Sequence, residues 1–179
     1  MKPELVEFTE WNELTEQIDD EFGDGISKAL LGDRAPVTIT HGDTKSFYLI
    51  PMEWMNDIDD MGKDYEIHSL GIRLGNMTKE GFRLSLQILE DLAEVTDRKL
   101  VVSRQGAEAF SYGRSILKES VIRLNPDLRR GQRVIVLNKD GEVLGLAALS
   151  VDGNKLKRLA RNRLVAKNIV DIGAYLRGA

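Results

Sequence analysis

A run of basic residues near the C-terminal end of the chain is the clearest chemical signal in this sequence. No acidic residue occurs between Asn154 and Asn168. Ammonium and guanidinium groups neutralise phosphates, and arginine adds a planar, bidentate geometry that lysine lacks. This pattern predicts binding to a phosphate backbone, with a solvated basic face as the alternative. We call these six residues the basic ridge: Lys155, Lys157, Arg158, Arg161, Arg163 and Lys167.

The charge of the chain is divided unequally between its halves. The 179 residues carry a net charge of only −4. Residues 1–97 hold 22 acidic and 8 basic side chains, whereas residues 98–179 hold 17 basic and 7 acidic ones. Such asymmetry is typical of a polyanion-binding half joined to a half with another task.

Aromatic residues indicate which nucleic acid the basic half would bind. This half contains Phe110, Tyr112 and Tyr175, and none of its expected strands holds a pair of aromatic residues. A sheet that stacks bases is therefore disfavoured, and we expect Phe110 and Tyr112 in the core. No helix-turn-helix or zinc-finger pattern is present. Recognition of RNA backbone and shape fits better than readout of the DNA major groove.

Enzymatic motifs are absent from the sequence. Zero cysteines exclude disulfides, thiolate zinc sites, iron–sulfur clusters and cysteine nucleophiles. There is no phosphate-loop, dinucleotide-binding or nucleophile-elbow motif. A calcium loop after Asp57 fails, because Met61 and His68 stand where oxygen ligands are needed. We predict no catalytic residue, no metal and no cofactor, although an RNA-modifying enzyme remains an alternative because a lone catalytic aspartate has no signature.

The N-terminal half shows the periodicities of helices and of an antiparallel sheet. A helix from about Thr9 is stopped by Gly23-Asp24-Gly25, and a short helix over residues 26–31 follows. The other expected elements are strands over 37–40 and 46–50, a short helix after Pro51, strands over 68–74 and 82–88, and a helix over 89–95.

Two arginines mark the last pair of these strands. If the turn between them centres on Thr78, Arg73 lies beside Arg83, and His68 lies on the packed face. Adjacent arginines repel unless an acid or a phosphate lies between them. Nearby acids are the first explanation, and a ligand is the second.

The C-terminal half predicts a small barrel that positions the basic ridge. Asp140-Gly141 between two apolar runs is a strong hairpin signal. Gly153-Asn154 would cap a helical turn with Leu156, Leu159 and Ala160 inward, and Arg163 and Lys167 would share one face of the next strand. The expected elements are strands over 99–103, 121–124, 133–137 and 142–150, and a helix over 106–113.

These elements give an α+β fold class with two domains. Residues 1–96 would form an antiparallel sheet with helices, and residues 97–179 would form a small β-barrel. The longest apolar run, Val143 to Leu149, is too short to span a membrane. We therefore expect no membrane partner and a cytoplasmic location.

The order and spacing of several motifs resemble the Nip-seven family of archaeal and eukaryotic large-subunit ribosome biogenesis factors. The matching fragments span both halves of the chain. They are Ser69-Leu70-Gly71, Gly75, Thr78-Lys79, Phe82-Arg83-Leu84, Leu92-Ala93, Gly106-Ala107-Glu108, Phe110, Tyr112-Gly113, Leu117-Lys118, Asp171-Ile172-Gly173, Tyr175 and Arg177.

The resemblance implies a non-catalytic protein with an N-terminal α/β domain followed by a PUA domain, a small RNA-binding barrel. It implies RNA contacts at Lys157, Arg158 and Arg161, and as partners pre-rRNA, single-stranded or U-rich RNA, and ribosome assembly proteins or the exosome. We expect an archaeal-type monomer, with nucleolar location if the source were eukaryotic. An adaptor whose acidic half docks a basic partner is the other alternative. A secondary candidate RNA surface comprises Arg114, Lys118, Arg73 and Arg83.

Overall fold

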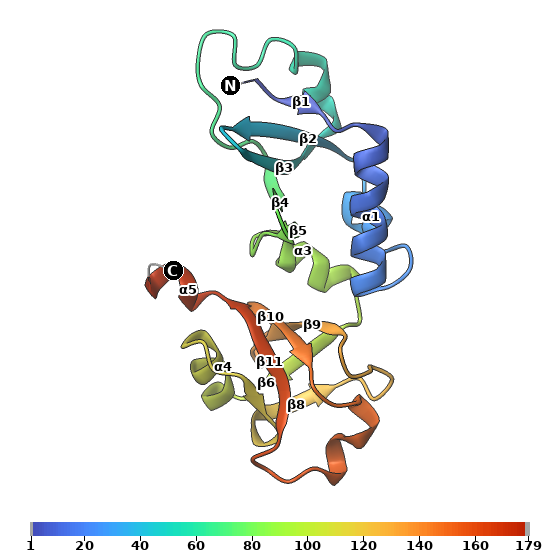
Figure 1. The fold of residues 1–179 in the computed structure, drawn as a ribbon, viewed down its shortest axis with the longest axis vertical. Helices are drawn as coiled ribbons and strands as arrows, with labels where there is room; N and C mark the ends of the chain where they lie inside the picture. The colour runs from blue at the N-terminus through green and yellow to red at the C-terminus, as the bar shows by residue number, and fades with distance from the viewer. Residues whose placement is uncertain (1, 178–179) are drawn as a thin grey trace. The chain divides into compact units, whose positions relative to one another are not determined.

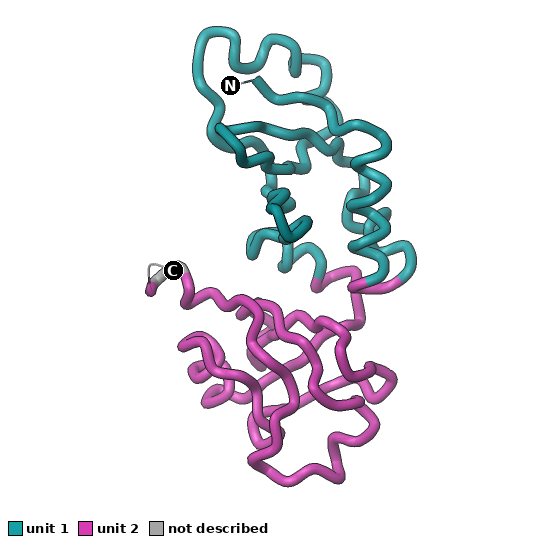
Figure 2. Tube along the Cα trace, in the orientation of Figure 1, with its two compact units in different colours: residues 1–20, 24–92 teal, residues 21–23, 93–179 magenta. Residues whose placement is uncertain are grey.

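A computed structural model describes residues 2–177, apart from the side chains of residues 175 and 176. The chain divides into two compact units, shown in two colours in Figure 2. One contains residues 1–20 and 24–92, and the other contains residues 21–23 and 93–179. We call them the N-terminal and C-terminal domains. The boundary at residues 96–97, as a limit of independent folding, stays a prediction.

An antiparallel sheet of five strands forms the N-terminal domain, with the strands side by side in sequence order (Figure 1). The strands are β1 (Glu4–Leu5), β2 (Arg34–His41), β3 (Thr44–Pro51), β4 (Ile72–Thr78) and β5 (Gly81–Leu84). The helices are α1 (Phe8–Phe22), α2 (Ile26–Leu31), α3 (Ile88–Val95) and the 3-10 helix η1 (Met52–Asp57).

Both faces of this sheet are covered. Val37 and Ile39 of β2 pack on one face with Ile58 from the segment that follows η1. On β3, Phe47 belongs to the alternate side-chain set and meets Phe82 edge to face, with ring centroids 5.4 Å apart. In α1, three apolar side chains spaced by four residues are fully buried, as the amphipathic pattern predicts: Leu14, Ile18 and Phe22.

The register of the β4–β5 hairpin differs from the prediction. Asn76, and not Arg73, lies opposite Arg83. The turn at Lys79-Glu80 sets this register, and Gly81 follows it with a positive φ of +116°, which glycine adopts without strain. The two arginines therefore do not face each other as a pair.

The prediction for His68 is also wrong. His68 precedes β4 and is exposed, because the strand starts only at Ile72. Its imidazole stacks on that of His41, with ring centroids 5.5 Å apart and an interplanar angle of 12°. Ile67 takes the buried position against the sheet instead.

The C-terminal domain is a six-stranded sheet that curls into a nearly closed barrel (Figure 1), which confirms the predicted α+β class. The order is β7-β11-β10-β9-β6-β8, and only the β6–β9 pair is parallel among those described. The strands are β6 (Lys99–Val102), β7 (Ile116–Leu117), β8 (Val121–Leu124), β9 (Arg133–Leu137), β10 (Val143–Leu149) and β11 (Leu164–Asp171). The helices are α4 (Arg104–Ser111), α5 (Gly173–Arg177) and the 3-10 helices η2 (Lys118–Ser120) and η3 (Gly153–Arg158).

Strand curvature in this barrel depends on a glycine in β10. Gly145 has φ +150°, and a Cβ atom there would lie 2.0 Å from the carbonyl oxygen of Val170 on β11. The register of β10 against β9 shifts at this point, so the strand bends around the core. Fully buried Val134, Val136 and Val165 fill the interior of the barrel. None of the helices in residues 2–177 is long and apolar enough to cross a membrane.

Candidate nucleic-acid interface

The first half of the basic ridge lies on η3, which the barrel holds in place from two sides. The N–H of Gly153 donates to the carbonyl oxygen of Leu128 at 2.8 Å. A Cβ at Gly153 would lie 2.3 Å from the carbonyl oxygen of Asn125, so only glycine fits this approach. Leu156 and Leu159 are partly buried against the barrel core. The turn is therefore anchored to the barrel, and its lysines and Arg158 are left exposed.

Ala160 does not point inward as predicted, because helical spacing ends before it. Leu159 has an extended backbone with ψ 148°, and Ala160 is exposed. The core of the turn is therefore made by two side chains rather than three.

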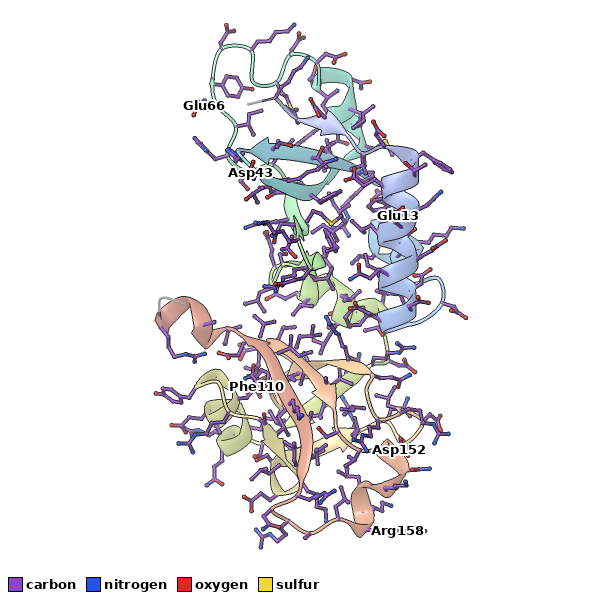
Figure 3. All side chains as sticks on the ribbon, in the orientation of Figure 1. Glu13, Asp43, Glu66, Phe110, Asp152 and Arg158 are labelled. Atoms are coloured by element: carbon purple, nitrogen blue, oxygen red, sulfur yellow. The ribbon has the colours of Figure 1, made fainter. Side chains whose placement is uncertain are left out.

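Two members of the ridge lie near carboxylates. The ammonium group of Lys155 is 3.4 Å from Asp152, and the guanidinium group of Arg161 is 3.9 Å from Glu119. The side chains of the two cations are 65% and 85% exposed, so water and salt weaken both pairs. Figure 3 labels Asp152, which precedes η3, and Arg158, the last residue of η3.

The other four members have no acidic partner. They are Lys157, Arg158, Arg163 and Lys167, all exposed, and within residues 2–177 no carboxylate lies within 4 Å of their charged nitrogens. Four free cations in one short segment repel one another, and a bound polyanion relieves that repulsion.

Asp152, which directly precedes η3, links this helix to the loop that carries Arg130. The backbone N–H of Arg130 donates to its Oδ1 at 2.9 Å, and Lys155 lies on its other oxygen. The pKa of Asp152 is lowered, first by the hydrogen bond from Arg130 and then by Lys155. Asp152 is thus ionised at neutral pH, where it joins the loop that carries Arg130 to η3.

Two of the secondary candidates lie beside the ridge. The N–H of Lys118 on η2 donates to the carbonyl oxygen of Arg163 at 2.9 Å. The carbonyl oxygen of Arg114 accepts a hydrogen bond from Asn168 Nδ2 at 3.4 Å, and the Arg114 side chain is exposed. The backbones of Arg114 and Lys118 therefore lie next to β11 and the residue before it.

The other two secondary candidates belong to the N-terminal domain and are separately satisfied. Arg83 forms an ion pair with Glu80 in its own hairpin. The Nη2 of Arg73 lies 3.5 Å from Ser46 Oγ. Arg73 and Arg83 are therefore not paired across the two strands, and each has a polar partner of its own.

The aromatic residues of the C-terminal domain differ in their burial. Phe110 is fully buried in the barrel, as predicted, and is labelled in Figure 3. Tyr112 is 71% exposed, which overturns the prediction that it lies in the core. Tyr112 follows α4, where the chain turns at Gly113 with φ +87°. The side chain of Tyr175 lies outside the described residues.

One basic residue that lies at this surface was not predicted. Arg130 lines a depression together with Arg163 and Lys167, although more than thirty positions separate it from them in the sequence. The doublet Arg129-Arg130 before Gly131 was the available signal. Among the described residues, no three His, Asp or Glu side chains gather closely enough to hold a metal ion.

The C-terminal barrel matches a known protein family. Residues 98–179 match the family model described as the UPF0113 PUA domain. The C-terminal domain therefore has a PUA-type fold. The chain is 34% identical over 110 residues to the 60S ribosome subunit biogenesis protein nip7 of Schizosaccharomyces pombe, which covers 61% of each protein. It is 27% identical over 139 residues to a UPF0113 protein of Archaeoglobus fulgidus, covering 78% of this chain and 76% of that protein.

The resemblance to the Nip-seven family is thereby confirmed, although the match spans only about three fifths of the length of the nip7 relative. The fold of the whole chain is also known elsewhere. A conserved PUA domain protein from Thermoplasma acidophilum has a TM-score of 0.65 at 11% identity, over 98% of this chain and 97% of that one. The basic ridge lies within the part of the chain that matches the PUA family model.

Proposed function

We propose that this protein is a non-catalytic RNA-binding factor in the assembly of the large ribosomal subunit. Several of its relatives are named as ribosome biogenesis proteins, and its C-terminal domain matches a PUA family model. The observation that carries the proposal is the set of four exposed ridge cations that have no acidic partner in residues 2–177. Such a surface neutralises phosphates without selecting bases.

The RNA ligand is pre-rRNA or another single-stranded, U-rich RNA. Single strands place their phosphates on a flexible backbone that can follow an irregular turn such as η3. Arg161 exchanges its long contact to Glu119 for a phosphate, because an ion pair at 3.9 Å with a strongly exposed arginine is weak. Arg114 and Lys118 extend this surface along β7 and η2, while Arg73 and Arg83 would form a separate contact in the N-terminal domain.

Fluorescence anisotropy of labelled single-stranded RNA, titrated with the full chain, tests this function. The variant Lys157→Gln with Arg158→Gln removes two free cations and should weaken binding about tenfold at low salt. Lys139→Gln in the exposed β9–β10 turn removes a cation from the same domain and should leave affinity unchanged. Equal affinity of all three proteins would contradict RNA binding through the ridge.

A second candidate function rests on the N-terminal domain. Glu13 and Glu16 are exposed on α1, and Figure 3 labels Glu13 on this helix. This acidic surface suits a basic assembly protein or a component of the exosome, with the chain acting as an adaptor. Pull-down after nuclease treatment separates the two functions. Partners retained without RNA favour the adaptor, and partners lost with the RNA favour the first proposal.

A further inference from the structure

A depression of about 780 Å³ lies on the C-terminal domain, and two members of the basic ridge, Arg163 and Lys167, line it. Its floor is the β10–β11 pair, in which Lys167 lies opposite Ala148 and the N–H of Ser150 donates to the carbonyl oxygen of Val165 at 2.8 Å. Arg130 and Gly131 line another part of it, held there because the N–H of Gly131 donates to the carbonyl oxygen of Leu149 at 2.8 Å.

The lining of this depression is positively charged and polar. Three cations line it, together with the polar residues Ser150 and Asn162, and no aspartate or glutamate is among the lining residues. Within residues 2–177, no carboxylate lies within 4 Å of the charged nitrogens of Arg130, Arg163 or Lys167. A concave surface with one sign of charge focuses its field and attracts an anion.

We propose that Arg130, Arg163 and Lys167 form a phosphate site for RNA, separate from the exposed cations of η3. This inference rests on the proposed function and adds to it a residue, Arg130, from a distant part of the sequence. Arginine can hold a phosphate with two parallel hydrogen bonds, so Arg130 and Arg163 together position the group while Lys167 supplies charge. The RNA backbone then passes from η3 to the face of the β10–β11 pair.

Asp152 connects the two phosphate sites without touching either ligand. One carboxylate oxygen holds the backbone N–H of Arg130, and the other lies near the ammonium group of Lys155 on η3. Asp152 is a positioning residue in this arrangement. The side chain of Arg130 takes no part in this hydrogen bond, so replacing it leaves the loop attached.

The test is RNA binding by the full-length variant Arg130→Gln, measured with labelled oligouridylate at several salt concentrations. We expect affinity to fall several-fold, and the log-log salt slope to become shallower by about 0.7, the value for one phosphate contact on a single strand. Arg130→Lys should restore most of the slope and only part of the affinity, because lysine keeps the charge and loses the bidentate geometry. Lys139→Gln, at the other end of β10, is the matched control and should match the wild type.

The outcomes separate this inference from the proposed function. Wild-type affinity and slope in Arg130→Gln, with weakened binding in the η3 variant, would overturn the phosphate site and keep the RNA-binding function. Failure of the wild-type protein to bind oligouridylate or mixed RNA would remove both. An unchanged midpoint of thermal unfolding in Arg130→Gln shows that any loss of affinity comes from the missing guanidinium group.

Discussion

The arginines of the two domains differ in how their charge is satisfied. In the N-terminal domain, Arg34 donates to Asp91 at 2.6 Å and to backbone carbonyl oxygens of α2, and Arg83 pairs with Glu80. In the C-terminal domain, Arg158 and Arg163 have no acidic partner in residues 2–177. The same side chain thus serves as an internal link in one domain and remains available for a ligand in the other.

The domains also differ in what holds their basic residues in place. Arg34 is held in place by the contacts of its own guanidinium group, and its side chain is only 21% exposed. The ridge is held by its backbone: Gly153 bonds to Leu128, and Lys118 and Glu119 bond to residues 163 and 161. Substituting a ridge side chain should therefore affect binding alone, whereas substituting Arg34 should affect stability alone.

Charge reversal in the basic ridge should produce the largest loss of RNA affinity. The variant Arg158→Glu with Arg161→Glu should weaken RNA binding on the order of a hundredfold at low salt, because it turns two phosphate contacts into repulsions. The loss should be about equal for U-rich and mixed sequences, since phosphate contacts carry no base information. Anisotropy titrations of both RNAs provide the measurement.

The matched control reverses two arginines in the other domain. Arg73→Glu with Arg83→Glu changes the net charge by the same amount, and it should alter affinity less than about threefold if the ridge dominates. A comparable loss in this variant would show that the N-terminal arginines form a second RNA surface.

Replacing Gly153 should affect both the stability of the barrel and the position of η3. In Gly153→Ala the new Cβ would lie 2.3 Å from a backbone oxygen, which cannot move aside as a flexible side chain would. We expect a loss of about 3 kcal/mol in the free energy of unfolding, measured by denaturant titration. Gly141→Ala provides the control, because nothing lies within 4 Å of a Cβ there and only its backbone conformation is strained. Equal destabilisation by the two variants would contradict the anchoring role of Gly153.

Removing Arg34 should cost stability and leave RNA binding intact. Arg34→Ala leaves Asp91 and two carbonyl oxygens without their donor, so the free energy of unfolding should fall by about 2 kcal/mol. A ridge substitution such as Lys157→Gln should show the opposite pattern, with wild-type stability and weaker binding. Loss of RNA affinity in a folded Arg34→Ala protein would be inconsistent with the division between the domains.

The smallest expected effect is a pH dependence at Asp152. Its pKa is lowered below the ordinary value of 3.8, chiefly by the N–H of Arg130 and then by Lys155. Ionised Asp152 therefore contributes stability above pH 3.8, and this contribution is lost as the pH falls through the lowered pKa. Thermal unfolding of wild type and Asp152→Asn across this range should show a steeper acid loss in the wild type. Parallel curves would mean that Asp152 adds nothing to the anchoring of η3.

Local signals made part of this fold predictable from the sequence. The β9–β10 hairpin follows from Asn138 and Gly141: Asn138 Oδ1 accepts from two backbone N–H groups of the turn, and Gly141 has φ +84°. The start of η3 could be located in the same way, from Gly153 followed by alternating leucines and cations.

A local side-chain hydrogen bond and a tertiary contact determine the two features that the sequence did not show. In the β4–β5 turn, Thr78 Oγ1 donates to the carbonyl oxygen of Gly81 at 2.7 Å, and this closure moves the register away from Arg73 and Arg83. Arg130 comes close to Arg163 only because the loop before β9 bonds to the end of β10. Periodicity within one strand contains no information about either contact.

The most direct test of the account is the salt dependence of RNA binding by the full-length wild-type protein. If several ridge cations each meet a phosphate of single-stranded RNA, a plot of log affinity against log salt should have a slope on the order of −2 to −4, at about −0.7 per phosphate. A flat plot, or no binding at low salt, would contradict the claim that the free cations of the PUA domain bind an RNA backbone.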